Sequence, residues 1–127
     1  MEIPTYLKYI FLLHFIACVI FGILFFFVVE FYVSAVGWPF LDPAAGRVIG
    51  AMFLGYSMAS LFGYRAASWE EVKIVVIGHI TWTLLAATGM TWMIIAHPTI
   101  PVLAGWLNVL ISAIFFVLFT YSYFKAK

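Results

Sequence analysis

Hydrophobic residues fill four long runs of this chain, and short polar segments separate them. The runs lie at about 9–31, 47–64, 72–96 and 102–124. A helix that crosses a bilayer needs about 20 consecutive apolar residues. The pattern therefore predicts four transmembrane helices, at about 5–33, 43–64, 69–96 and 100–124. No loop between them is long enough to fold alone, so we predict one domain, residues 1–127.

The segments between the runs carry signals that end and begin helices. Residues 37–40, Gly-Trp-Pro-Phe, interrupt the first run. Asp42 suits an N-cap, and Pro43 suits the first helical position, where its missing N–H would be unpaired anyway. Short connections place neighbouring helices antiparallel. The predicted fold class is an all-α integral membrane protein, with four helices in an up-down-up-down bundle.

The composition excludes several classes of protein. Hydrophobic residues make up 67% of the chain and charged residues only 9%, whereas a soluble domain has about 25% charged residues. A chain of this kind is expected to have the lipid bilayer as its main partner. We expect no nucleic-acid partner, because there is no basic cluster. We find no hydrolase, kinase, nucleotide-binding or redox-thiol motif and expect a protein that is not an enzyme.

The distribution of basic residues predicts the orientation. Short cytoplasmic loops are enriched in Lys and Arg. Arg47 alone lies on one side of the predicted bundle, and the other side holds Lys8, Arg65, Lys73, Lys125 and Lys127. Both termini should therefore be cytoplasmic. The layout, with Asp42-Pro43 opening a glycine-rich second helix, is similar to that of many small prokaryotic four-helix membrane proteins. This resemblance implies a prokaryotic cell membrane and no particular activity.

Small residues recur at four-residue spacing in the second predicted helix. They are Gly46, Gly50, Ala51, Gly55, Ala59 and Gly63. Residues four apart lie on nearly one face of a helix, and small residues let membrane helices approach closely. We predict that this is the central helix of the bundle, with other helices against its small face, and that Gly55→Leu disrupts the packing. The simpler interpretation is that small residues are common in membrane helices.

Two histidines lie at matched depth on parallel helices. His14 and His79 are each five or six residues inside the cytoplasmic boundary, or roughly 8–9 Å deep. They could be axial ligands of a b-type haem. Cys18, one turn beyond His14, makes a soft-metal site for copper or zinc the alternative. The simplest expectation is no cofactor, with each imidazole hydrogen-bonded inside the bundle.

Glu30 and Arg47 form a candidate ion pair at the outer boundary. A paired charge at that depth is less costly than a lone one. We expect the pair to clamp the first two helices together. A gate or proton relay in a transporter is the alternative, although no further ionisable group continues inward from Glu30.

The remaining polar candidates lie in the outer half of the last two helices. Asn108, Ser112 and Thr88 are predicted to form interhelical hydrogen bonds, worth about 0.6 kcal/mol each in membranes. A polar substrate pocket is the alternative. Trp82 lies deep enough to pack on a pigment or quinone ring, or more simply on a neighbouring helix.

These features favour a small accessory or structural subunit of a larger membrane protein complex, which assembles with other subunits or with itself. Two alternatives stay open. One is a haem- or metal-binding electron-transfer protein that uses His14 and His79. The other is a small oligomeric transporter or channel.

Overall fold

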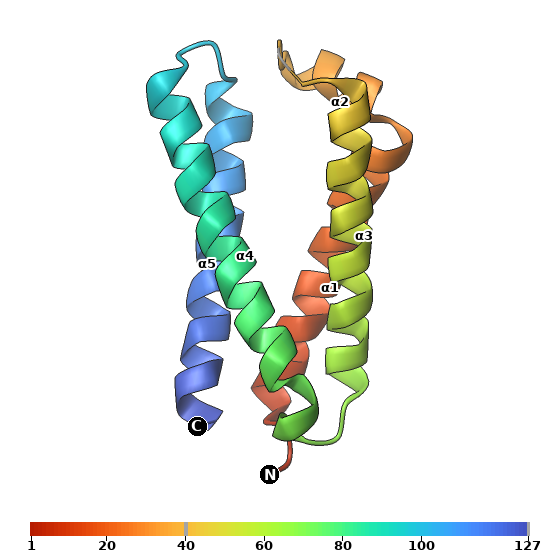
Figure 1. Ribbon diagram of the computed structural model, residues 1–127, viewed down its shortest axis with the longest axis vertical. Coiled ribbons are helices and arrows are strands. Elements are labelled where there is room, and N and C mark those ends of the chain that lie inside the picture. Colours follow the sequence, from red (N-terminus) through yellow and green to blue (C-terminus); the bar gives the residue numbers. More distant parts are fainter. Residues whose placement is uncertain (40, 127) are drawn as a thin grey trace.

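The computed structural model describes residues 1–39 and 41–126, which form an all-α fold of five helices. Four helices are long and apolar enough to cross a membrane: α1 (Thr5–Phe27), α3 (Pro43–Arg65), α4 (Trp69–Ala96) and α5 (Val102–Ala126). The up-down-up-down prediction is confirmed, and both ends of the chain lie at the same end of the bundle (Figure 1). Phe40 and Lys127, used in the sequence analysis, lie outside the described residues.

The bundle consists of two helical hairpins. One is formed by α1 with α3 and the other by α4 with α5, and contacts between the hairpins are far fewer than contacts within them. Figure 1 shows the hairpins close together near the termini and diverging toward the opposite end. We call these the closed end and the open end. The prediction that α3 is central is therefore corrected: its extensive contact is with α1 alone.

The main hydrophobic core lies at the closed end. Leu7 and Phe11 of α1 pack with Val76 of α4 and Phe119 of α5, and all four are 0% exposed. The amino-terminal segment is fixed to the loop between α3 and α4 and to the start of α4, because the Ile3 N–H donates to the Ala67 carbonyl at 3.3 Å and the Trp69 N–H donates to the Met1 carbonyl at 2.9 Å. This core joins the two hairpins at the closed end.

Glycines bring α3 into close contact with α1 and with α2. A Cβ added at Gly46 would lie 2.5 Å from Cγ2 of Val29, and one at Gly63 would lie 2.7 Å from Cε1 of Phe11. At Gly50 it would meet the backbone of Phe26. These three glycines line the contact because only a hydrogen fits there.

The rest of the predicted small face points elsewhere. Ala51 and Gly55 are exposed, and a Cβ at Gly55 would meet nothing within 4 Å. Ala59 is only half-buried. Successive helical residues are about 100° apart, so Gly55 lies about 140° around the helix from Gly50. The prediction that Gly55→Leu disrupts packing within the chain is therefore wrong.

The first predicted helix, 5–33, is also corrected. It breaks at Val28, whose φ is −132° and ψ is 37°, and a separate helix α2 (Val29–Val36) follows. The break allows Val29 to pack fully buried on Gly46. Neither Pro nor Gly marks the break in the sequence.

The other boundaries differ by two residues or fewer. The last helix begins at Val102 and ends at Ala126, not at 100 and 124. Asp42 caps α3 as predicted, because the Ala44 N–H donates to Asp42 Oδ1 at 2.7 Å.

Candidate functional site

The two hairpins are connected by a chain of hydrogen bonds between two histidines and a serine. His14 Nδ1 on α1 lies 2.8 Å from Ser60 Oγ on α3, and Ser60 Oγ lies 3.0 Å from His79 Nε2 on α4. A hydroxyl donates one hydrogen bond and accepts another. Ser60 therefore donates to one imidazole and accepts an N–H from the other. All three side chains are at most 2% exposed.

Aromatic side chains enclose this His14–Ser60–His79 cluster. The two imidazole centroids lie 4.3 Å apart, with their planes at 49°. Phe115 packs edge-on against His14 at 4.8 Å, and Phe119 lies 5.3 Å from His14 and 4.9 Å from His79. The cluster is thus a filled part of the bundle interior.

Neighbouring polar atoms lie against each histidine. Cys18 Sγ, one turn along α1, lies 3.6 Å from His14 Nε2. Thr83 on α4 donates from Oγ1 to the carbonyl of His79 at 2.6 Å. Each of these contacts is made within one helix, so the hydrogen-bonded link between the hairpins depends on Ser60.

This arrangement does not fit a haem held between the histidines. Two axial imidazoles must lie on opposite faces of a porphyrin plate, whereas these rings pack directly on each other. His14 Nδ1 and His79 Nε2 are already bonded to Ser60. Among residues 1–39 and 41–126, no three His, Cys, Asp or Glu side chains are placed to share a metal ion. The geometry is that of imidazoles hydrogen-bonded inside the bundle.

Glu30 and Arg47 meet at the open end. Arg47 Nη2 donates to Glu30 Oε1 at 2.8 Å. The Arg47 side chain is 41% exposed and the Glu30 side chain is 58% exposed. This ion pair connects α2 to α3 at the surface. It lies apart from the histidine cluster, which is on the α1, α3 and α4 faces nearer the closed end.

The Glu30–Arg47 ion pair should attach α2 to α3 less strongly in acid. Hydrogen bonds from the backbone of Glu30 and from Arg47 lower the pKa of the Glu30 carboxyl below its ordinary 4.5. A lowered pKa means that the pair stabilises the fold above pH 4.5 and stops doing so as pH falls through the lower native pKa. Glu30→Gln should therefore be slightly less stable than the parent at pH 7. The measurement is the thermal unfolding midpoint of the parent and of Glu30→Gln at each pH between 7 and 3. The difference between the two midpoints should shrink as the pH falls. A difference that stays constant would contradict the prediction.

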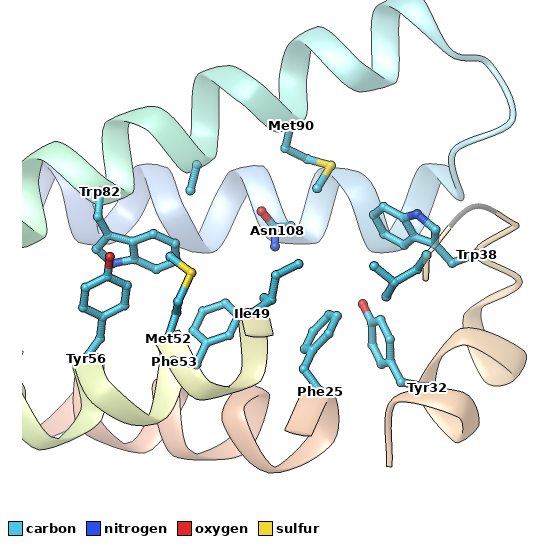
Figure 2. A pocket seen from close by; sticks show the side chains of 12 residues that line it. Phe25, Tyr32, Trp38, Ile49, Met52, Phe53, Tyr56, Trp82, Met90 and Asn108 are labelled. Carbon is cyan, nitrogen blue, oxygen red and sulfur yellow. The ribbon is translucent and has the colours of Figure 1, made fainter. Parts of the chain in front are cut away.

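A pocket of about 250 Å³ lies between the hairpins toward the open end (Figure 2). Its aromatic lining consists of Phe25, Tyr32, Trp38, Phe53, Tyr56 and Trp82. Figure 2 shows Asn108 on α5 pointing into this space from one hairpin, and Tyr32 lying on the opposite wall.

The predicted interhelical hydrogen bonds of the outer half are not formed by Thr88. Its Oγ1 donates to the carbonyl of Leu84 in its own helix at 2.8 Å, so this prediction is corrected. Ser112 is buried at 7% exposure. Asn108 faces the pocket and forms no hydrogen bond to a described residue.

Comparison of the chain with protein-family models, curated proteins and solved structures found no match to any of them. The site is therefore interpreted from its own geometry.

Sequence reasoning paired the two histidines but missed the role of Ser60. The available signal was a hydroxyl beside the small residues of α3, three positions before Gly63. It also missed the aromatic pocket, since its side chains come from all five helices or the loop after α2.

Proposed function

We propose that this protein is a non-enzymatic accessory subunit of a larger membrane assembly, joining other membrane helices through the outward faces of α3 and α4. The observation that carries the proposal is a set of uncovered glycines. A Cβ at Gly55 of α3, or at Gly78 or Gly89 of α4, would meet nothing within 4 Å. Such positions let the backbone of another helix approach closely.

The buried polar groups support a structural role for the interior. Ser60 is hydrogen-bonded to one nitrogen of His14 and one nitrogen of His79, and phenylalanines pack on both rings. A catalytic or transport site needs polar groups that face a substrate or a water-filled path. We therefore regard the cluster as the connection that holds the hairpins together.

We further propose that the closed end is cytoplasmic, in a prokaryotic cell membrane. Lys8, Arg65, Lys73 and Lys125 belong to the helix ends or loop at the closed end, and Arg47 belongs to the open end. The excess of basic residues on one side favours that side as cytoplasmic.

Assembly can be tested with Gly55→Leu. The parent, extracted in a mild detergent, should run as a complex whose mass exceeds that of one 14.4 kDa chain. Gly55→Leu should keep the helical fold of the single chain, measured by far-UV circular dichroism, because the added side chain meets no atom of the chain. It should shift the native mass toward the single chain, because a leucine separates helices that a glycine allows to touch.

The control is a matched leucine on the same helix, at exposed Val48. Val48→Leu adds volume at a site that already carries a side chain and should leave the native mass unchanged. A parent that is a lone chain in both detergent and lipid nanodiscs, or a Gly55→Leu variant that assembles like the parent, would overturn the proposal.

A further inference from the structure

The pocket between the hairpins has aromatic walls from both sides. Tyr56 and Trp82 stack across the α3–α4 boundary with centroids 4.9 Å apart and planes at 21°. Phe53 meets Trp82 edge-on at 5.4 Å, and Phe25 lies 4.7 Å from Tyr32. Flat rings prefer such stacked and edge-on contacts. The walls are therefore suited to a flat, unsaturated ring more than to a flexible acyl chain.

The pocket lining carries several polar side-chain groups, and among them the indole N–H of Trp82 is buried with no hydrogen-bond partner among the described residues. Asn108 of α5 and Tyr32 of α2 line the pocket from opposite walls, both are half-buried, and neither forms a side-chain hydrogen bond to another described residue. An amide in an apolar environment is unfavourable without a hydrogen-bond partner. Such a residue inside a membrane protein is by default a candidate for ligand recognition. Asn108 offers two N–H donors, and Tyr32 offers one O–H donor.

The dimensions agree with a ring of modest size. The pocket volume is about 250 Å³, and an apolar cavity of about 150 Å³ is enough for benzene. A complete helix, with a diameter of about 10–12 Å including side chains, is much larger than this space. The pocket lies between the two hairpins, whose backbones diverge toward the open end (Figure 1).

We propose that this pocket binds a lipid-soluble ring dicarbonyl of the quinone class. The ring lies among Tyr56, Trp82 and Phe53. The Asn108 amide donates to one carbonyl oxygen, and Tyr32 supplies a second donor on the opposite wall. Binding is the whole of the inference, and no electron transfer is assigned. This inference does not rest on the assembly proposed above, because Gly55, Gly78 and Gly89 face outward, whereas the pocket lies between the hairpins.

The first test places a large side chain in the pocket. The purified protein, in nanodiscs of a saturated phosphatidylcholine, is titrated with a decyl-substituted benzoquinone while tryptophan fluorescence is followed. The parent should show a saturable quenching component above the linear effect of quinone dissolved in lipid. Ala86 lines the pocket, whereas Ala87 lines a shallow depression elsewhere on α4. Ala86→Phe should remove the saturable component, and Ala87→Phe should keep it.

The second test addresses recognition of the carbonyl groups and leaves the pocket volume nearly unchanged. Asn108→Leu should weaken binding of the benzoquinone about 3- to 10-fold, the effect of losing one neutral hydrogen bond. Binding of decylbenzene, which has the ring and tail without carbonyls, should be unchanged by that substitution. The parent should prefer the quinone over decylbenzene by a similar factor.

Each contrary outcome overturns the proposal. A parent without saturable quenching does not bind this class of ligand. Equal competition by decylbenzene, or by decane, would show an unspecific apolar pocket or one for acyl chains. If Ala86→Phe shows the same saturable quenching component as Ala87→Phe, the ligand binds elsewhere. The native mass of the same samples reports separately on assembly, so failure of one proposal is distinguishable from failure of the other.

Discussion

Replacing Gly50 by leucine should separate α1 from α3 and lower the free energy of unfolding by about 3 kcal/mol or more, the upper range for overpacking a close contact. A Cβ there would lie 2.8 Å from the carbonyl carbon of Phe25 and from Cα of Phe26. Both are backbone atoms, which cannot rotate away as a side chain could. The whole first hairpin must therefore shift.

The measurement is reversible unfolding in mixed micelles, with Gly55→Leu as the matched control. The two glycines lie on the same helix, five residues apart, but Gly55 has open space around it. In micelles dilute enough to hold single chains, we expect a large loss of stability for Gly50→Leu and almost none for Gly55→Leu. Equal losses in the two variants would mean that the α1–α3 contact is not arranged as described.

Replacing Ser60 by alanine should have the second largest effect, a loss of about 1–2 kcal/mol. Removing the hydroxyl leaves His14 Nδ1 and His79 Nε2 facing each other without their common partner. Leaving buried polar atoms unpaired costs about 1–3 kcal/mol, and measured hydrogen bonds between membrane helices reach about 1.7 kcal/mol. Because Ser60 is 0% exposed, water does not easily replace it.

Ser57→Ala is the control for this substitution. Ser57 is also buried on α3, but its hydroxyl donates to the carbonyl of Leu54 in the same helix at 2.6 Å. That carbonyl keeps its place in the helix when the hydroxyl is removed, so the loss should be well below that of Ser60→Ala. A distance measured by spin labels at exposed Met58 and Leu85 should lengthen only in Ser60→Ala. If Ser57→Ala destabilises as much, the histidine–serine chain does not hold the hairpins together.

Much of the fold follows from local sequence. Each apolar run is long enough to cross a bilayer, and the helix that starts at Pro43 begins where the Asp-Pro signal predicts. These features depend on the length of a run and on one residue at a boundary. Such information is contained in consecutive residues and needs no knowledge of the rest of the chain.

The break at Val28 shows what local sequence does not contain. No glycine or proline interrupts the first run there, and the apolar pattern continues to Phe31. The helix breaks because Val29 packs on Gly46 and Glu30 reaches Arg47, and both partners belong to α3. The favourable contacts are long-range, so they are visible only after the hairpin has formed.

The histidine cluster was only partly predictable, because the sequence gives the depth of a residue in the membrane but not the direction of its side chain. Counting residues along parallel helices placed His14 and His79 at matched depth, because the rise per residue is fixed. Rotation about each helix axis is not fixed by spacing. Only the packed structure turns both rings toward Ser60 and fills the remaining space with Phe115 and Phe119. This rotation produces the hydrogen-bonded cluster in which both rings contact Ser60.

By itself, the sequence determined that this is a membrane protein with four spanning helices in antiparallel order, because apolar length and short connections are local properties. Tertiary structure alone decided that the helices form two hairpins, which glycines of α3 are covered, and where Asn108 faces. Those choices depend on which helix faces meet, and lipid accepts nearly any apolar face equally well. The decisive contributions are a few close backbone contacts and one buried hydroxyl, which hydrophobic patterning does not record.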